Sequence, residues 1–277
     1  MRCDRRVHSS PDHVLGILGG MSWHSTAQYY RAINEHVATA RGGHASARIL
    51  LSSLDFAEVR DCQLRGDWAA AGELLAREAS ALERAGAGSI AIATNLMHRV
   101  ADDVEAAVGV PLVHIADAVA ETARGLGATT LGIVGTRWVM AERFYADRLA
   151  RHGIAAVVPP TGARAELDRI VFDELTRGIV TDASRAAFRD AFAALEADGA
   201  DAIVLACTEI MLLVGAGDAG VPLIDSCAAH ATALARIALG ERSAAALAPE
   251  LLHRVEHRAD GGHALGAVPV PQGDGPA

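Results

Sequence analysis

The fold is decided by a stretch that occurs twice, LGILG at residues 15–19 and LGIVG at residues 131–135. The repetition extends outward: GSIAIAT at 88–94 matches DAIVLAC at 201–207, GVPLV at 109–113 matches GVPLI at 220–224, and Tyr29 recurs as Tyr145. The chain therefore consists of two copies of one unit. Each copy ends a predicted buried strand with one polar residue, which is Thr94 in the first half and Cys207 in the second.

Apolar runs alternate with helical patterns along both halves. Strands are predicted at 14–19, 47–52, 89–93, 112–115, 130–134, 155–158, 202–206 and 222–224, and helices at 68–85, 138–152, 165–177, 183–198 and 226–239. Strands that alternate with helices form parallel sheets covered on both faces. The pattern predicts an α/β protein with two pseudo-symmetric three-layer αβα domains, mainly parallel sheets and an active site in the interdomain cleft.

Composition shifts along the chain predict the domain boundaries. Residues 1–13 have no periodicity and are expected to form a flexible arm. Residues 14–115, together with about 225–240, are assigned to the first domain, and 116–224 to the second. From residue 245 to 277 we expect a short helix followed by a mostly disordered tail. His253 and His257 in this tail are four residues apart, but no third ligand accompanies them, so no metal site is predicted.

Charge and composition restrict the class of partner. The 277 residues carry a net charge of −9 and no basic run, which argues against nucleic-acid binding and favours a small-molecule partner. No apolar stretch approaches the roughly 18 residues that a membrane span needs, so we expect a cytoplasmic protein with no membrane partner. The four cysteines lie far apart and suggest no disulfide framework. All 25 basic residues are arginine, and a lysine Schiff base to pyridoxal phosphate is therefore excluded.

Thr94 and Cys207 are the candidate catalytic residues. Ligands of parallel sheets gather at the carboxyl ends of the strands, where both residues lie. If the two halves pack about a pseudo-twofold axis, the two side chains face one substrate from opposite sides, as inversion of a carbon centre requires. The pKa of a thiol falls at a helix N-terminus or beside a cation, so Cys207 is expected to act as a thiolate base.

Three further polar residues follow the predicted strands. Asn95 and Thr208 come directly after the catalytic pair, where their side chains can hold a carboxylate, cap a helix, or do both. Thr136 is the repeat equivalent of Gly20 and is expected to reach the cleft. The turn GGMS at 19–22 is not a phosphate-binding loop, so nucleotide binding is unsupported. Asp55 begins the sequence DFAE and is interpreted as a helix cap.

Residues 14–240 resemble the pyridoxal-phosphate-independent aspartate/glutamate racemases. The motifs that carry the resemblance are GILGGM at 16–21, TNLMH at 94–98 and CTE at 207–209. The resemblance implies a racemase without a cofactor, in which Cys207 takes the proton of an L-amino acid and Thr94 occupies the opposite face. It implies substrate binding by Met21, Ser53, Asn95, Thr136 and Thr208, and a homodimer is compatible with it.

The sequence departs from the usual family pattern at two positions, and alternatives remain open. Thr94 replaces the first catalytic cysteine and Leu96 replaces a substrate-binding threonine, in a way that resembles a bacterial branch with broad specificity. A lone cysteine also suits a decarboxylase or isomerase of the same superfamily, and the mismatch with Thr94 suits a non-catalytic amino-acid binding protein. The motifs leave the substrate side chain open, and Arg60 is the candidate partner of a second carboxylate.

Overall fold

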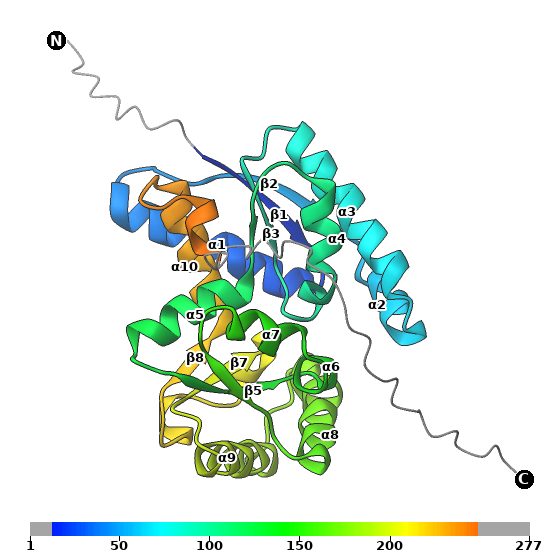
Figure 1. Cartoon of the computed structure of the whole chain (residues 1–277), viewed down its shortest axis with the longest axis vertical. Helices are drawn as coiled ribbons and strands as arrows, with labels where there is room; N and C mark the ends of the chain where they lie inside the picture. Colours follow the sequence, from blue (N-terminus) through cyan, green and yellow to red (C-terminus); the bar gives the residue numbers. More distant parts are fainter. Residues whose placement is uncertain (1–12, 249–277) are drawn as a thin grey trace, which may run out of the picture.

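The computed structural model describes residues 13–248, which form two parallel four-stranded sheets (Figure 1). The first sheet has the order β2-β1-β3-β4 and the second has the order β6-β5-β7-β8. The strands are β1 (Val14–Gly19), β2 (Arg48–Ser53), β3 (Ser89–Ile92), β4 (Leu112–Val113), β5 (Thr130–Gly135), β6 (Ala155–Val157), β7 (Ala202–Ala206) and β8 (Leu223–Asp225). All pairings are parallel, so the predicted α/β class with two pseudo-symmetric sheets is confirmed.

The strand register confirms the internal duplication. Leu15 of β1 pairs with Ser89 of β3, and Leu131 of β5 pairs with Ala202 of β7, which is the correspondence that the repeat gives. Tyr29 and Tyr145 are both fully buried beneath their sheets. The two copies therefore fold alike.

Helices cover both faces of each sheet because their apolar sides are buried there. The α-helices are α1 (Trp23–Arg41), α2 (Phe56–Arg65), α3 (Trp68–Arg84), α4 (Ala101–Ala107), α5 (Ile115–Gly125), α6 (Arg137–Ala141), α7 (Phe144–Ala150), α8 (Thr161–Arg169), α9 (Asp182–Ala197) and α10 (Ser226–Ala238). One face of the first sheet packs against α1 and α10, and the other face packs against α3. One face of the second sheet packs against α5 and α7, and the other face packs against α8 and α9. Shorter helical segments are η1 (Leu96–Val100), η2 (Ile170–Glu174), η3 (Leu175–Arg177), η4 (Thr208–Leu212), η5 (Ala216–Asp218) and η6 (Ala244–Leu247).

Two predicted helices differ from those observed. The helix expected at 138–152 is divided into α6 and α7, since Glu142 adopts an extended backbone and its carboxylate pairs with Arg99 of the first half. The helix expected at 165–177 begins at Thr161 and passes through the π-helical segment η2. Asp55 caps α2 as predicted, with its Oδ1 accepting a hydrogen bond from the Ala57 amide at 2.9 Å.

The ends of the chain, at 1–12 and 249–277, lie outside the described residues, and with them most of the expected arm and tail and both His253 and His257. α10 packs against both α1 and α5, beside the boundary between the two sheets (Figure 1). The division of the chain into domains stays a prediction. Between residues 13 and 248, no helix is long and apolar enough to cross a membrane, and no three His, Cys, Asp or Glu side chains form a metal-binding group.

Candidate active site

A cavity of about 310 Å³ lies between the two halves, at the carboxyl ends of the central strands of both sheets. The segments that follow β1, β3, β5 and β7 supply most of its lining. Phe56 and Gln63 of α2 and the segment η2–η3 close it on the remaining sides. Ligand sites of parallel α/β sheets occupy this position because the loops and helix N-termini converge there.

Most of the site residues predicted from the sequence line this one cavity. They are Met21, Thr94, Asn95, Thr136, Cys207 and Thr208. Ser53 ends β2 with an exposed side chain and is not among the residues that line the cavity. Arg60 is also absent from the lining; its guanidinium carbon lies 4.7 Å from the centre of the Phe172 ring.

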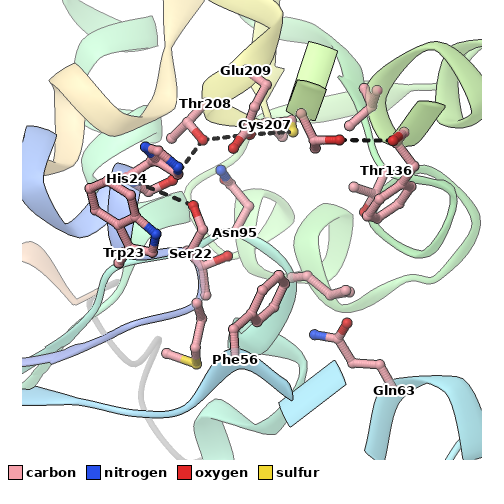
Figure 2. A pocket seen from close by; sticks show the side chains of 18 residues that line it. Ser22, Trp23, His24, Phe56, Gln63, Asn95, Thr136, Cys207, Thr208 and Glu209 are labelled. Atoms are coloured by element: carbon pink, nitrogen blue, oxygen red, sulfur yellow. Dashed lines mark hydrogen bonds between the residues drawn. The ribbon is translucent and has the colours of Figure 1, made fainter. Parts of the chain in front are cut away.

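The Cys207 thiol is joined to a short hydrogen-bond network (Figure 2). Cys207 Sγ donates to Glu209 Oε2 at 3.2 Å, and Thr208 Oγ1 donates to the same oxygen at 2.6 Å. Because Thr208 gives its hydroxyl proton to Glu209, the 2.8 Å contact between Ser25 and Thr208 is donated by Ser25. The network holds the Glu209 carboxylate beside the thiol and links α1 of the first half to η4 of the second.

The surroundings of Cys207 raise its pKa well above the ordinary value of a thiol. Burial is the largest cause, and the negative charges of Glu209 and Asp168 add to it. Sequence reasoning expected the opposite direction, since a helix N-terminus or a nearby cation would have lowered the pKa. The neighbour in the structure is a carboxylate, so the free thiol keeps its proton and needs an acceptor before it can act as a base.

On the side of the cavity that Thr94 lines, His98 of η1 holds the backbone of Thr94 rather than its hydroxyl. His98 Nε2 accepts from the Ile115 amide at 3.1 Å, so Nδ1 carries the ring proton and donates it to the Thr94 carbonyl at 2.8 Å. Both ring nitrogens are thereby engaged. Burial lowers the pKa of His98 to about 3, which keeps the ring neutral. His98 therefore positions the end of β3 and does not activate the Thr94 side chain.

Two buried polar atoms among the residues of the lining have no hydrogen-bond partner within the described structure: Asn95 Oδ1 and Thr136 Oγ1. The orientation of the Asn95 amide follows from its neighbour. Ser226 Oγ donates its only proton to the Leu205 carbonyl at 2.8 Å, so it must accept from Asn95 Nδ2 at 3.0 Å. Asn95 thus keeps a free acceptor and Thr136 a free hydroxyl, and Figure 2 shows both residues beside the cavity. Buried polar atoms normally have partners, so this pair is suited to a bound ligand.

The turn after β1 brings Met21 and the start of α1 to the cavity. Gly20 has a φ of +88°, and a Cβ at this position would lie 2.1 Å from the Leu54 carbonyl oxygen. Its amide donates to Thr26 Oγ1 at 2.8 Å. Only glycine fits this backbone conformation so close to another segment of chain.

Several lining residues were not predicted as site residues. Glu209 belongs to the CTE motif, but its role follows only from its contact with Cys207. Trp23 and Phe56 are partly exposed aromatic residues at the starts of helices, a weak signal that a cavity lies nearby. Val171 and Phe172 belong to the π-helical segment η2, which the helical periodicity of the sequence did not reveal.

Comparison with known proteins agrees with this arrangement. A model of the family described as Asp/Glu/Hydantoin racemase matches residues 18–234. The chain is 48% identical to a candidate Asp/Glu racemase from Yersinia pestis, with a TM-score of 0.79 over 82% of this chain and 99% of that one. It is 33% identical to an aspartate racemase homologue from Pyrococcus horikoshii OT3, with a TM-score of 0.71 and the same coverage.

A more distant structure shows the same fold. Glutamate racemase from Francisella tularensis, solved with D-glutamate, is 15% identical to this chain and has a TM-score of 0.57 over 87% of this chain and 85% of that one. The family match spans most of the chain and includes both halves of the repeat, so the resemblance inferred from the motifs is confirmed. The chain belongs to the Asp/Glu/Hydantoin racemase family, whose members are isomerases.

Proposed function

We propose that this protein inverts the α-carbon of an amino acid without a cofactor, by proton transfer between Cys207 on one face and Thr94 on the other. The observation that carries the proposal is the composition of one cavity. Thr94 and Cys207, which follow equivalent strands of the repeat, line it together with Asn95 and Thr136, whose side chains carry unpartnered polar atoms. The match to the racemase family supports the reaction class.

The free polar atoms suit the two charged groups of an amino acid. An ammonium group only donates hydrogen bonds, and Asn95 Oδ1 is an acceptor without a donor. A carboxylate only accepts them, and the Thr136 hydroxyl has a proton to donate. In the proposal these two contacts fix the α-carbon between Cys207 and Thr94.

Proton removal requires a thiolate, and Glu209 is the acceptor that makes one. The Cys207 proton passes to Glu209 Oε2, which already accepts its hydrogen bond at 3.2 Å. The thiolate then takes the α-proton of the L-amino acid, and the electron pair of the C–H bond remains on the substrate as a carbanion delocalised into the carboxylate. Thr208, which donates to the same Glu209 oxygen, keeps the carboxylate in place.

The proton that completes the inversion comes from the Thr94 side, from the hydroxyl or from a water molecule that it holds. Solvent then returns a proton to this donor, and Glu209 releases the proton that it took from Cys207, which restores the starting state. A threonine hydroxyl is a far weaker base than a thiolate, and His98 is committed to the Thr94 carbonyl. Proton removal from the D-amino acid is therefore slower than from the L-form. Since mirror-image amino acids have equal free energies, this asymmetry is kinetic and slows net turnover in both directions.

The test is exchange of the α-proton for deuterium in D₂O, followed by NMR, with a panel of L- and D-amino acids. We expect exchange from L-forms to be faster than from D-forms. Absence of exchange with every amino acid would leave an amino-acid binding protein instead, and release of CO₂ from a malonate-type acid without exchange would favour the decarboxylase alternative.

Two variants test whether Cys207 and Thr94 act on opposite faces of the α-carbon. Cys207→Ser should reduce exchange from the L-amino acid by a factor of about 10² or more, because general base catalysis contributes that much. Thr94→Cys should raise exchange from the D-amino acid, since it supplies a thiol on the second face. Exchange that survives Cys207→Ser would reject the assignment of the base.

A further inference from the structure

The walls of the cavity differ in chemistry from one end to the other. Cys207, Thr208 and Glu209 form a polar end, and Phe56 and Gln63 lie well away from them across the cavity (Figure 2). Apolar side chains of Met21, Trp23, Leu96, Val171 and Phe172 also line the cavity, beside polar ones such as Ser22 and Thr176. A substrate whose α-carbon sits between Thr94 and Cys207 therefore directs its side chain toward apolar and aromatic groups.

The described lining residues include neither arginine nor lysine. His24, at the rim, is the one side chain among them that can become a cation, and Glu209 is an acid. Asp168 adds a second carboxylate, which is close enough for its negative charge to raise the pKa of Cys207. A side-chain carboxylate placed in this cavity would lose water without gaining a countercharge, which is costly.

The Arg60 guanidinium lies beside the aromatic wall, but other contacts occupy it. Its guanidinium carbon lies 4.7 Å from the centre of the Phe172 ring and 5.6 Å from that of Trp138, and NH1 donates to Gln63 Oε1 at 3.2 Å. Gln63 in turn donates through Nε2 to Met97 Sδ at 3.3 Å. The cation thus stacks beside Phe172 outside the lining, and both ends of the Gln63 amide are engaged.

We propose that the cavity takes amino acids with uncharged, apolar or aromatic side chains, of the size of methionine, leucine or phenylalanine, in preference to aspartate and glutamate. The proposal rests on the function proposed above and specifies its substrate class. The side chain packs against Phe56, Val171 and Phe172. Specificity then comes from apolar contact at one end of the cavity and from recognition of the ammonium and carboxylate groups at the other.

The test compares kcat/KM for α-proton exchange of L-methionine, L-leucine and L-phenylalanine with that of L-aspartate, L-glutamate and L-lysine. We expect each of the first three to exceed both acids by at least about tenfold. Equal or faster exchange with aspartate, glutamate or lysine would overturn this proposal and leave the racemase function standing. No exchange with any of the six would overturn the substrate class, and the racemase function would fall with it only if the wider panel of L- and D-amino acids also showed none.

Variants at Phe56 test the apolar wall directly. Phe56 is 37% exposed, so the fold tolerates its replacement. Phe56→Arg supplies a cation and should shift the ratio of aspartate to methionine exchange at least about tenfold toward aspartate, while Phe56→Leu, the matched control, should leave the order of substrates unchanged. An unchanged ratio in Phe56→Arg would overturn the proposal.

The Arg60→Gln variant tests the competing possibility that Arg60 turns inward to hold a side-chain carboxylate. We expect Arg60→Gln to leave the ratio of aspartate to methionine exchange as it is in the unaltered protein. A selective loss of aspartate and glutamate exchange in this variant would overturn the proposal, because it would place a cation in the site.

Discussion

Glu209 has two opposing effects on Cys207. Its negative charge is the second cause, after burial, of the raised thiol pKa, yet it is also the acceptor of the thiol proton. A raised pKa means that the thiolate form accumulates only at high pH. Exchange from the L-amino acid should therefore increase with pH across the neutral and mildly alkaline range.

Glu209→Gln should separate these two effects. Loss of the carboxylate lowers the Cys207 pKa, so the rising part of the pH profile moves to lower pH. Below this pH range exchange falls, because the protonated thiol has lost the acceptor of its proton. The pKa itself can be measured from the pH dependence of thiol alkylation, with Cys207→Ser as the control for the other cysteines. If the rising part of the pH profile stayed at the same pH or moved to higher pH, the role assigned to Glu209 would be wrong.

Thr136 offers a test of substrate binding that is independent of proton transfer. Its hydroxyl is buried and has no partner within residues 13–248, so Thr136→Val removes no contact of the free protein. A hydrogen bond to a charged group contributes about 1.5–3 kcal/mol. We therefore expect kcat/KM to fall roughly 10- to 150-fold, mostly through KM, with an unchanged melting temperature. Thr136→Ser keeps the hydroxyl, so its kcat/KM should remain close to that of the unaltered protein. An equal loss of kcat/KM in both variants would exclude the hydroxyl as the cause.

The repeat made the central site residues predictable. Thr94, Asn95, Thr136, Cys207 and Thr208 follow strands whose ends the duplicated sequence marks, and the carboxyl ends of parallel strands meet at one edge. The electrostatics could not be predicted in this way. The direction of the Cys207 pKa depends on where the Glu209 carboxylate lies. Its place depends on the hydrogen bond from Thr208, whose hydroxyl accepts in turn from Ser25.

At the scale of elements, the strands were more predictable than the helices. The strand β1 occupies the predicted residues 14–19 and β7 the predicted residues 202–206, because buried parallel strands are continuous apolar runs between turns. The break between α6 and α7 depends on Glu142, whose partner Arg99 lies in the other half of the chain. Contacts so distant in sequence leave no local pattern.

The turn between β1 and α1 should respond sharply to Gly20→Ala. Both Gly20 and Gly66 have positive φ, +88° and +68°, but a Cβ at Gly66 would meet nothing within 4 Å, whereas one at Gly20 would collide with the backbone of Leu54. Gly66→Ala should thus cost only the conformational strain of about 1–2 kcal/mol. We expect Gly20→Ala to destabilise the protein more than this in urea unfolding and to reduce exchange, since the turn places Met21 at the cavity. Equal losses of stability in the two variants would show that the close approach of Gly20 to the Leu54 backbone is unimportant.

At the scale of the whole molecule, polar contacts join the two halves around the site. Ser25 of α1 bonds to Thr208 after β7, and Asn95 after β3 reaches β7 through Ser226. Because buried polar groups are stable only when they are paired, these contacts restrict how the halves can move relative to each other.

Behind the site, three buried histidines make the fold sensitive to acid. The ring centres of His98 and His114 are 4.3 Å apart and those of His98 and His230 are 5.9 Å apart. Burial lowers the pKa of His98 to about 3 and that of His230 to about 4, and it lowers that of His114 well below the ordinary value. Each ring is therefore neutral in the folded protein under conditions in which it would be protonated in the unfolded chain.

The sign of the pH effect follows from these lowered values. A histidine whose folded pKa is depressed contributes its full stability above the unfolded pKa of about 6.5, and that stability is lost as pH falls toward the folded pKa. At pH 5 the loss is about 2 kcal/mol for each of His98 and His230, and His114 adds to it in the same direction, which together is a large part of the total stability of many domains. We expect the free energy of unfolding in urea to fall steeply between pH 6.5 and 5, before the carboxylates titrate. His98→Gln should reduce the number of protons taken up on unfolding by about one, so that the free energy of unfolding depends less steeply on pH. A free energy that stays constant from pH 7.5 to 5 would show that the three rings take up protons in the folded state, and that the buried cluster is open to water.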